Sequence, residues 1–339
     1  MQIIGEYVDR LITVENRPRN FPQRGMIRQL YEKALEKCGG RPVTLLAAEK
    51  LMANVKKDDN VIIITGVGCA PFFLHGETDG PLGAASLARA ISLGLGAKPL
   101  FVVGDLDVEP VKVTAKASGI NIEDYEITKQ LRHAGTIIPF PLGDNEAKQA
   151  AKEIVEKYRP KAILSVETLG PNRKGVIHGA MGLPFSSPKL HYLFDEARKR
   201  GILTIGCVDC GNEIGSGTIV EAVRKVARYG DVCQCPCKGG IACVTEADVT
   251  VPAACSNWGG YGIAAMLAVL VKNPDVLQDA DTERRMLEAN IMAGSIDGIS
   301  MRPIMVVDSM SDKTNQSLVT MLHMLVENGL KEEAYMRET

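Results

Sequence analysis

Carboxylate and amide side chains gather in a few glycine-containing segments of this chain, where they could form an active site. Four carboxylates are candidate catalytic residues: Glu77, Asp79, Asp209 and Glu213. Neighbouring residues and two further segments supply candidate substrate ligands: Thr78, Gly80, Glu167, Asn172, Arg173, Asn212, Ser256 and Asn257. A carboxyl group can act as a general acid or base, and an amide can donate a hydrogen bond to a developing oxyanion. These residue types therefore indicate proton-transfer chemistry on a small molecule.

The same segments also have purely structural interpretations. Thr78 or Asp79 could cap a helix that begins at Pro81, because Thr and Asp favour the cap and proline favours the first helical position. The segment 209–217, DCGNEIGSG, could be a turn followed by a helix cap. The SNWGG segment at 256–260 opens another helix, whose backbone N–H groups could hold an anion or simply be capped. The sequence leaves both interpretations open at each segment.

Metal ligation is a further interpretation of the carboxylates. Asp79, Asp209 and Glu213 are candidate ligands, and their oxygens suit a hard cation such as Mg or Mn. Such an ion would polarise a substrate carboxylate as a Lewis acid. A nucleotide cofactor is not expected, because the segment 66–71 has proline where the dinucleotide-binding fingerprint needs its third glycine, and the chain has no phosphate-binding loop motif.

The chain has nine cysteines, and this odd number favours free thiols or metal ligands over a disulfide framework. Four of them cluster in a short stretch: Cys233, Cys235, Cys237 and Cys243. The thiolates of Cys233, Cys235 and Cys237 could bind zinc or an iron–sulfur cluster, or form a redox pair, although CxCxC is not a standard spacing for these sites. Cysteine at a strand end, as at Cys207, is also common as a small core residue.

Histidines and arginines add weaker signals. Two histidines, His75 and His178, fall in candidate site segments. The other three are expected on the surface of helices or loops: His133, His191 and His323. Three arginines could bind an anionic substrate, since a guanidinium matches a carboxylate: Arg24, Arg173 and Arg302. Each of these arginines could equally be a solvated surface residue.

Short apolar runs alternate with helical patterns along most of the chain. Strands are predicted at 61–64, 99–103, 136–139, 162–166, 202–205, 249–252 and 304–307. Helices are predicted at 81–95, 109–118, 145–158, 190–200, 217–229 and 258–271. The alternation predicts an α/β, Rossmann-like fold with a mostly parallel sheet and helices on both faces. A helical N-terminal segment (1–58) is expected to pack on the α/β catalytic domain (59–339). Ligands of such sheets bind beyond the carboxyl ends of the strands, where the polar segments fall.

Composition and hydropathy exclude several classes of protein. Lys and Arg total 39 against 41 Asp and Glu, so the chain lacks the basic excess of a nucleic-acid binder. No apolar run reaches the roughly 18 residues of a membrane span, and the N-terminus has no signal-peptide pattern, so we expect a cytoplasmic protein that binds no membrane. The expected partner is a small carboxylic or amino acid, and the helical N-terminal arm makes the chain a candidate homo-oligomer.

Three motifs resemble the D-glutamate cyclase family. They are ETDGPLGAASLARA (77–90), DCGNEIGSG (209–217) and SNWGGYG (256–262), with further similarity in RGMIRQLYEKAL (24–35) and GSIDG (294–298). The resemblance covers nearly the whole chain. It implies a Rossmann-like α/β fold and an intramolecular lyase reaction, in which D-glutamate loses water to give 5-oxo-D-proline.

Two segments depart from the family pattern, because 170–172 (GPN) and 179–182 (GAMG) lack arginines that family members carry. A lyase or isomerase acting on another small carboxylic acid therefore stays an alternative. A metal- or redox-binding protein that uses the cysteines is the other alternative.

Overall fold

The computed structural model describes residues 1–17 and 23–335, and its centre is one parallel β-sheet. In this part of the chain seven strands lie in the order β3-β4-β2-β1-β5-β6-β7, each parallel to its neighbours. They are β1 Asn60–Thr65, β2 Lys98–Gly104, β3 Asn121–Ile122, β4 Ala134–Phe140, β5 Ala162–Val166, β6 Leu203–Val208 and β7 Val249–Pro252. The strand order reverses between β1 and β5, and this is the point where open α/β sheets bind their ligands.

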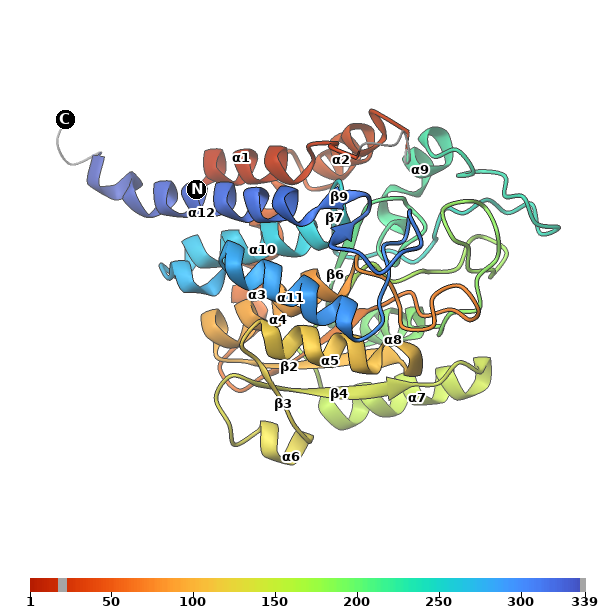
Figure 1. The fold of residues 1–339 in the computed structure, drawn as a ribbon, viewed down its shortest axis with the longest axis horizontal. Helices are drawn as coiled ribbons and strands as arrows, with labels where there is room; N and C mark the ends of the chain where they lie inside the picture. Colours follow the sequence, from red (N-terminus) through yellow and green to blue (C-terminus); the bar gives the residue numbers. More distant parts are fainter. Residues whose placement is uncertain (18–22, 336–339) are drawn as a thin grey trace.

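The sheet is buried on both faces because its aliphatic residues alternate between two cores. In β1, Val61 and Ile63 belong to the larger core, whereas Ile62 and Ile64 belong to the smaller one. The larger core is covered by α1 Gln2–Ile12, α2 Met26–Lys37, α3 Val43–Asn54, α4 Pro81–Leu95, α5 Val108–Ala117, α9 Val220–Val226, α10 Ser256–Leu270, α11 Ala280–Met292 and α12 Asp312–Tyr335. The smaller core is covered by α7 Asp144–Tyr158 and α8 His191–Arg200, next to the short α6 Tyr125–Thr128 (Figure 1). The predicted α/β fold with helices on both faces of a parallel sheet is confirmed.

The three N-terminal helices share the larger core with the sheet and are tied together by one buried carboxylate. Asp9 of α1 accepts hydrogen bonds from the backbone N–H groups of Val43 (2.7 Å) and Thr44 (3.1 Å), so it caps α3 from another helix. The hydroxyl of Tyr31 in α2 donates to the same carboxylate at 3.0 Å. The end of α1 is therefore fixed relative to α2 and α3.

Some predicted elements in the C-terminal half are wrong. The strand predicted at 304–307 is reduced to β8 Val306–Val307, which pairs with β9 Met310–Ser311 in an antiparallel hairpin outside the main sheet. Asp308 and Ser309 between them both adopt positive φ, as a tight type I′ hairpin turn requires. The helix predicted at 217–229 already ends at Val226, and Gly230 then packs against the Val223 carbonyl, where a Cβ would lie 2.2 Å from the oxygen. The prediction did not include β3, α11 or α12.

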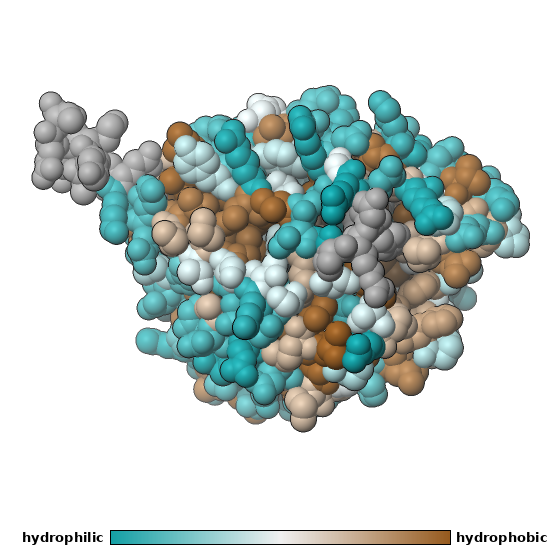
Figure 2. All heavy atoms as spheres, turned by 45° about the horizontal axis from the view of Figure 1, so that its top comes forward, coloured by the Kyte–Doolittle hydropathy of each residue, from teal (hydrophilic) through white to brown (hydrophobic). Residues whose placement is uncertain are grey.

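The long loops that follow the strands gather on one side of the molecule, opposite the N-terminus (Figure 1). Most of the candidate site residues lie in these loops. The face shown in Figure 2 is mainly hydrophilic, with hydrophobic areas between the charged side chains. No helix in the described ranges is long and apolar enough to span a membrane.

Candidate active site

Helices α4 and α10 begin side by side, and glycine makes their close approach possible. A Cβ at Gly260 would lie 2.8 Å from the Gly83 carbonyl oxygen, and a Cβ at Gly83 would lie 2.7 Å from the Asn257 Cα. Non-bonded atoms do not pack at such distances, so both positions need glycine. The contact brings the segment before α4 against the segment before α10.

Asp79 and Asn257 cap each other's helix at this contact. The carboxylate of Asp79 accepts hydrogen bonds from the backbone N–H groups of Ser256 (2.9 Å) and Asn257 (2.8 Å). The side-chain oxygen of Asn257 accepts hydrogen bonds from the N–H groups of Gly80 (2.9 Å) and Gly83 (2.7 Å). The anion at the N-terminus of α10 is therefore the protein's own Asp79, which the helix dipole stabilises.

Glu167 directly follows β5 in a backbone conformation that is unusual for its type. Its φ is +45°, in the left-handed region, which costs a residue with a Cβ about 1–3 kcal/mol. Its carboxylate accepts a hydrogen bond from the hydroxyl of Ser256 at 2.6 Å. The strained backbone thus holds the Glu167 carboxylate over the start of α10.

Arg17, in the loop after α1, is buried and bridges two carboxylates from distant segments. Its guanidinium forms ion pairs with Asp209 and, at 2.7 Å, with Asp308. Asp209 comes from the loop after β6, and Asp308 comes from the β8–β9 turn. The Nε atom of Arg17 is buried and has no hydrogen-bond partner in the described part of the protein.

Glu77 is enclosed by the segment that precedes the β8–β9 hairpin. The neighbouring Thr78 donates its N–H to the Ile296 carbonyl at 3.0 Å and its hydroxyl to the Val306 carbonyl at 2.9 Å. A Cβ at Gly298 would lie 1.9 Å from the Glu77 carboxylate, so the carboxylate occupies space that only glycine leaves open. The side chain of Glu77 makes no hydrogen bond to any residue described.

A cavity of about 280 Å³ lies between these segments. Its polar side is formed by Arg17, Glu77, Glu167, Asp209, Asn212 and Asp308. Its apolar lining includes Val67, Phe72, Phe73, Leu169, Met181, Leu183, Phe185 and Ile299. The cavity lining therefore combines four carboxyl groups and one guanidinium with a larger number of apolar side chains.

Burial raises the pKa of every carboxyl group in the cluster formed by Glu77, Asp79, Glu167, Asp209 and Asp308. The pKa of Glu77 lies well above its usual value because of burial and then the charge of Asp308, and the pKa of Glu167 does so because of burial and then the charge of Asp209. Burial raises the pKa of Asp79, Asp209 and Asp308 to about 7 in each case, and Arg17 opposes the shift. One guanidinium cannot neutralise five carboxylates, so at neutral pH several of them hold a proton or share a cation.

The sequence model of the family described as D-glutamate cyclase-like, C-terminal, matches residues 12–323. The chain belongs to this family. D-glutamate cyclase, mitochondrial, of Homo sapiens is 32% identical to it over 202 residues, which are 57% of this chain and 30% of the human protein. The match thus spans less than a third of the human protein's length. The range matched by the D-glutamate cyclase-like family includes Arg17 and all five clustered carboxylates.

Of the four predicted catalytic residues of this family member, Glu77 and Asp209 line the cavity, whereas Asp79 and Glu213 do not. Glu213 accepts hydrogen bonds from the backbone N–H groups of Cys210 (2.7 Å) and Gly211 (2.7 Å), and it is fully buried. Both its oxygens are therefore occupied by its own loop. Its position is suited to shaping the loop that carries Asp209, since removing it would leave buried N–H groups unpaired.

Two predicted substrate ligands also lie away from the cavity. The Asn172 amide donates to the Gly240 carbonyl at 2.6 Å, and its oxygen accepts from the Lys174 N–H at 2.9 Å. Arg173 forms an exposed ion pair with Asp231 at 3.0 Å. Among the other predicted ligands, Glu167 and Asn212 line the cavity. The remaining four do not line it but lie next to Asp79 where α4 and α10 meet: Thr78, Gly80, Ser256 and Asn257.

Sequence reasoning missed the two residues that pair across the site, Arg17 and Asp308. Arg17 belongs to the segment ENRPRNFPQRG (15–25), whose three arginines and two prolines are the signal that could have pointed to it. Asp308 follows a segment predicted as a strand, where a carboxylate ends the run as at the other site loops. His191, predicted at the surface, is instead buried at 8% exposure as the first residue of α8, with its ring 4.2 Å from that of Tyr192.

One group of carboxylates is arranged so that it could hold a cation. Single oxygen atoms of Asp79, Glu167 and Asp209 all lie within 4.8 Å of one another. Glu213, the third ligand predicted from the sequence, instead groups with Asp209 and Cys210. The all-oxygen set is the one that suits a hard divalent cation.

Proposed function

We propose that this chain is a lyase of the D-glutamate cyclase type, which closes D-glutamate to 5-oxo-D-proline with loss of water. The observation that carries the proposal is the cluster of buried carboxyl groups with raised pKa that surrounds the cavity in a member of this family. The human relative is named for this activity, although the match covers only part of it. The reaction joins the α-nitrogen to the side-chain carboxyl carbon and breaks one C–O bond of that carboxyl.

Proton transfer is the part of this reaction for which the cavity is best suited. Two protons leave the substrate nitrogen and two reach the departing oxygen, so the reaction needs both an acid and a base. Burial raises the pKa of Glu77 well above its usual value, which favours its protonated form, so we assign Glu77 as the acid that protonates the departing oxygen. Asp209 lines the cavity with a pKa of about 7, which suits a base that deprotonates the α-ammonium group.

Arg17 supplies the positive charge for substrate binding. It is the only lysine or arginine among the described residues that line the cavity, and one of its nitrogens is unpartnered. A guanidinium binds a carboxylate through parallel N–H groups. We therefore assign the substrate α-carboxylate to Arg17. Binding there would hold the substrate bent, so that its α-nitrogen meets its side-chain carboxyl carbon.

A divalent cation, Mg or Mn, fits the charge of the site. Asp79, Glu167 and Asp209 would hold it through carboxylate oxygens, which such ions prefer. With the ion bound, Asp209 would be a ligand and not the base. When bound, the ion would polarise the substrate's side-chain carboxylate as a Lewis acid. It would also offset the excess of carboxylates over Arg17, which otherwise repels the two carboxylates of the substrate.

The apolar wall favours a second candidate, a lyase or isomerase that acts on a small acid with a hydrophobic group. Phe72, Phe73, Met181 and Phe185 offer glutamate no polar partner. A panel of D- and L-amino acids and other small acids distinguishes the two substrate classes. Conversion of an apolar acid with no conversion of D-glutamate would favour this second candidate.

The test is proton NMR of the purified chain with D-glutamate and, separately, L-glutamate, with and without Mg or Mn. We expect 5-oxoproline from the D form. Glu77→Gln and Asp209→Asn should each lower the rate by roughly 100-fold or more, as for loss of a general acid or base. Glu283→Gln is the matched control, because Glu283 is equally buried with a pKa of about 7 but bonds to Tyr261 away from the cavity. Full activity in both site variants would refute the assigned roles.

A further inference from the structure

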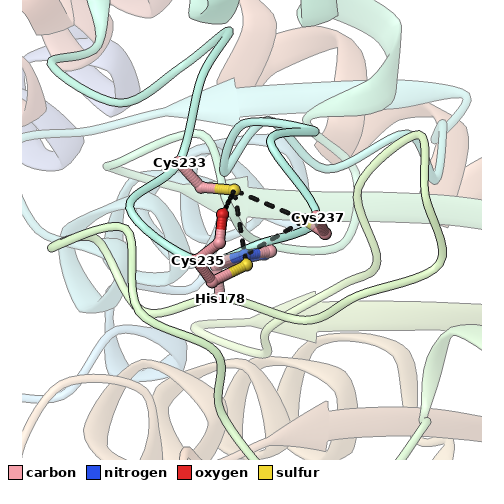
Figure 3. Close-up of side chains that lie close together, drawn as sticks. All are labelled: His178, Cys233, Cys235 and Cys237. Carbon is pink, nitrogen blue, oxygen red and sulfur yellow. Dashed lines mark hydrogen bonds between the residues drawn. The ribbon is translucent and has the colours of Figure 1, made fainter.

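Three thiols and one imidazole meet at a point separate from the carboxyl cluster (Figure 3). The sulfur of Cys233 lies 3.5 Å from that of Cys235 and 3.3 Å from that of Cys237. The Nε2 atom of His178 lies 3.2 Å from the Cys235 sulfur and 3.7 Å from the Cys237 sulfur. His178 comes from the loop after β5, and the cysteines come from the loop after α9, so the fold has brought two segments together here.

These separations match the edges of one tetrahedral zinc site. Zinc bonds of about 2.3 Å to sulfur and about 2.0 Å to nitrogen place neighbouring tetrahedral ligands roughly 3.5–3.8 Å apart. The four ligand atoms here lie within 4.8 Å of one another, and the four separations given above are 3.2–3.7 Å. A set this compact surrounds a single ion and is too small for an iron–sulfur cluster, whose cysteines bind separate iron atoms.

The surrounding groups orient the four side chains as metal ligands. The Nδ1 atom of His178 lies 3.1 Å from the Val176 carbonyl, which fixes the proton on Nδ1 and leaves the Nε2 lone pair directed at the sulfurs. The Cys237 sulfur accepts N–H groups from Gly239 at 3.4 Å and from Asn172 at 3.5 Å. Hydrogen bonds of this kind favour the thiolate form that binds metal.

We propose that His178, Cys233, Cys235 and Cys237 bind one zinc ion in a closed structural site. Four protein ligands leave no open position for substrate or water, as in structural rather than catalytic zinc sites. His178 and Cys233 and Cys235 are buried, and Cys237 is partly buried, so the ion would be shielded from solvent. This site goes beyond the proposed cyclase activity and does not depend on it.

The zinc site would brace one wall of the cavity. Gly179, Ala180 and Met181 line the cavity and directly follow the ligand His178. Gln234, between two cysteine ligands, donates its backbone N–H to the Gly182 carbonyl at 3.0 Å and its side chain to the Met181 carbonyl at 2.7 Å. The metal would thus fix the cysteine loop and the cavity wall relative to each other.

The experiment measures the metal content of the full-length chain, produced without an affinity tag and purified without chelator, by plasma mass spectrometry. We expect one zinc per chain in the wild type and a loss to background in Cys235→Ser and Cys237→Ser. Cys243→Ser is the matched control: Cys243 is buried in the same segment, but its sulfur accepts the Thr245 N–H at 3.3 Å and is outside the cluster. This control should keep its zinc.

Cobalt replacement keeps the proposal testable even where a variant fails to fold. Wild-type protein loaded with Co²⁺ should show thiolate-to-cobalt charge-transfer absorption and the strong visible bands of tetrahedral coordination. Cobalt at the carboxylate cluster would give neither, because its ligands are oxygens. A wild type without stoichiometric zinc, a cobalt spectrum without sulfur bands, or a disulfide among Cys233, Cys235 and Cys237 in the intact protein would each overturn the proposal.

Discussion

Removing the positive charge of Arg17 is the sharpest test of how the carboxyl cluster is stabilised. Arg17→Met keeps most of the side-chain length but deletes the guanidinium that pairs with Asp209 and Asp308. Both carboxyl groups are buried, and Arg17 lowers the pKa of each. Without it, their pKa values should rise above about 7, so the two groups should stay protonated to higher pH.

The expected loss of stability depends on pH, and its sign follows from the direction of the shifts. The pKa of Asp308 is raised from 3.8 when unfolded to about 7 when folded, so its contribution to stability is complete below about pH 4 and is lost as pH rises through 7. Arg17 limits that loss in the wild type. Deleting one partner of a buried pair costs about 3–5 kcal/mol once the other is ionised. At about pH 5.5 both carboxyl groups are neutral, and the cost should be under about 1 kcal/mol.

The assay is urea denaturation of wild type and Arg17→Met at about pH 5.5 and pH 8.5, followed by circular dichroism. Arg173→Met is the control, because Arg173 pairs with Asp231 at the surface and such pairs contribute about 0–1 kcal/mol. Its small effect should not grow with pH. An Arg17→Met variant that is destabilised equally at both pH values would refute the reasoning, since it would show that the loss comes from packing and not from charge.

Three further substitutions test other parts of the structure. Gly260→Ala should lower the unfolding free energy by about 1–3 kcal/mol in urea denaturation, because the new methyl group meets the Gly83 carbonyl; an unchanged stability would show that α4 and α10 can separate freely. Glu167→Gly should raise the unfolding free energy by up to about 1 kcal/mol, since it relieves the positive φ, while turnover measured by NMR falls sharply; parallel loss of both would contradict this trade-off. Asp79→Asn should cost about 1 kcal/mol at alkaline pH through the weaker cap of α10, and thermal unfolding that shows no such loss would remove Asp79 from that role.

The sequence predicted the sheet and the start of α4 well because local and global preferences agree there. The strand pattern at 61–64 lies within β1, and the helix predicted at 81–95 has the bounds of α4, Pro81–Leu95. Proline at the first helical position and a glycine just beyond the last turn fix those ends locally. Polar loops after parallel strands meet at one edge of the sheet, so Glu77, Glu167 and Asp209 could be grouped from the sequence.

The partners of those carboxylates could not be predicted, because they come from segments that do not follow a strand of the main sheet. The rule that ligands bind beyond the carboxyl ends of the strands does not point to such segments. Arg17 follows α1, whose end is held against α3 by the hydrogen bonds of Asp9. Asp308 reaches the site in the two-residue turn of the β8–β9 hairpin. The sequence did not indicate this turn, because the short apolar run before it is also typical of a strand of the main sheet. Glu213 sits between Asp209 and the helix that follows, yet its carboxylate turns back to its own backbone, and spacing alone does not specify that direction.

The way in which the fold supports each carboxylate separates the roles within the cluster. Asp79 is held by the N–H groups at the start of α10, Glu167 by the Ser256 hydroxyl, and Asp209 by Arg17. Each of these donors favours the ionised form. Glu77 has no such donor among the described residues and is instead surrounded by like charges, so it is the group whose ionisation the protein supports least. A buried carboxyl group whose protonated form is favoured beside neighbours that hydrogen-bond donors hold is the arrangement that general acid catalysis requires. The proton for the departing oxygen is therefore best assigned to Glu77, and Glu77→Gln, more than any other substitution, should stop turnover without unfolding the protein.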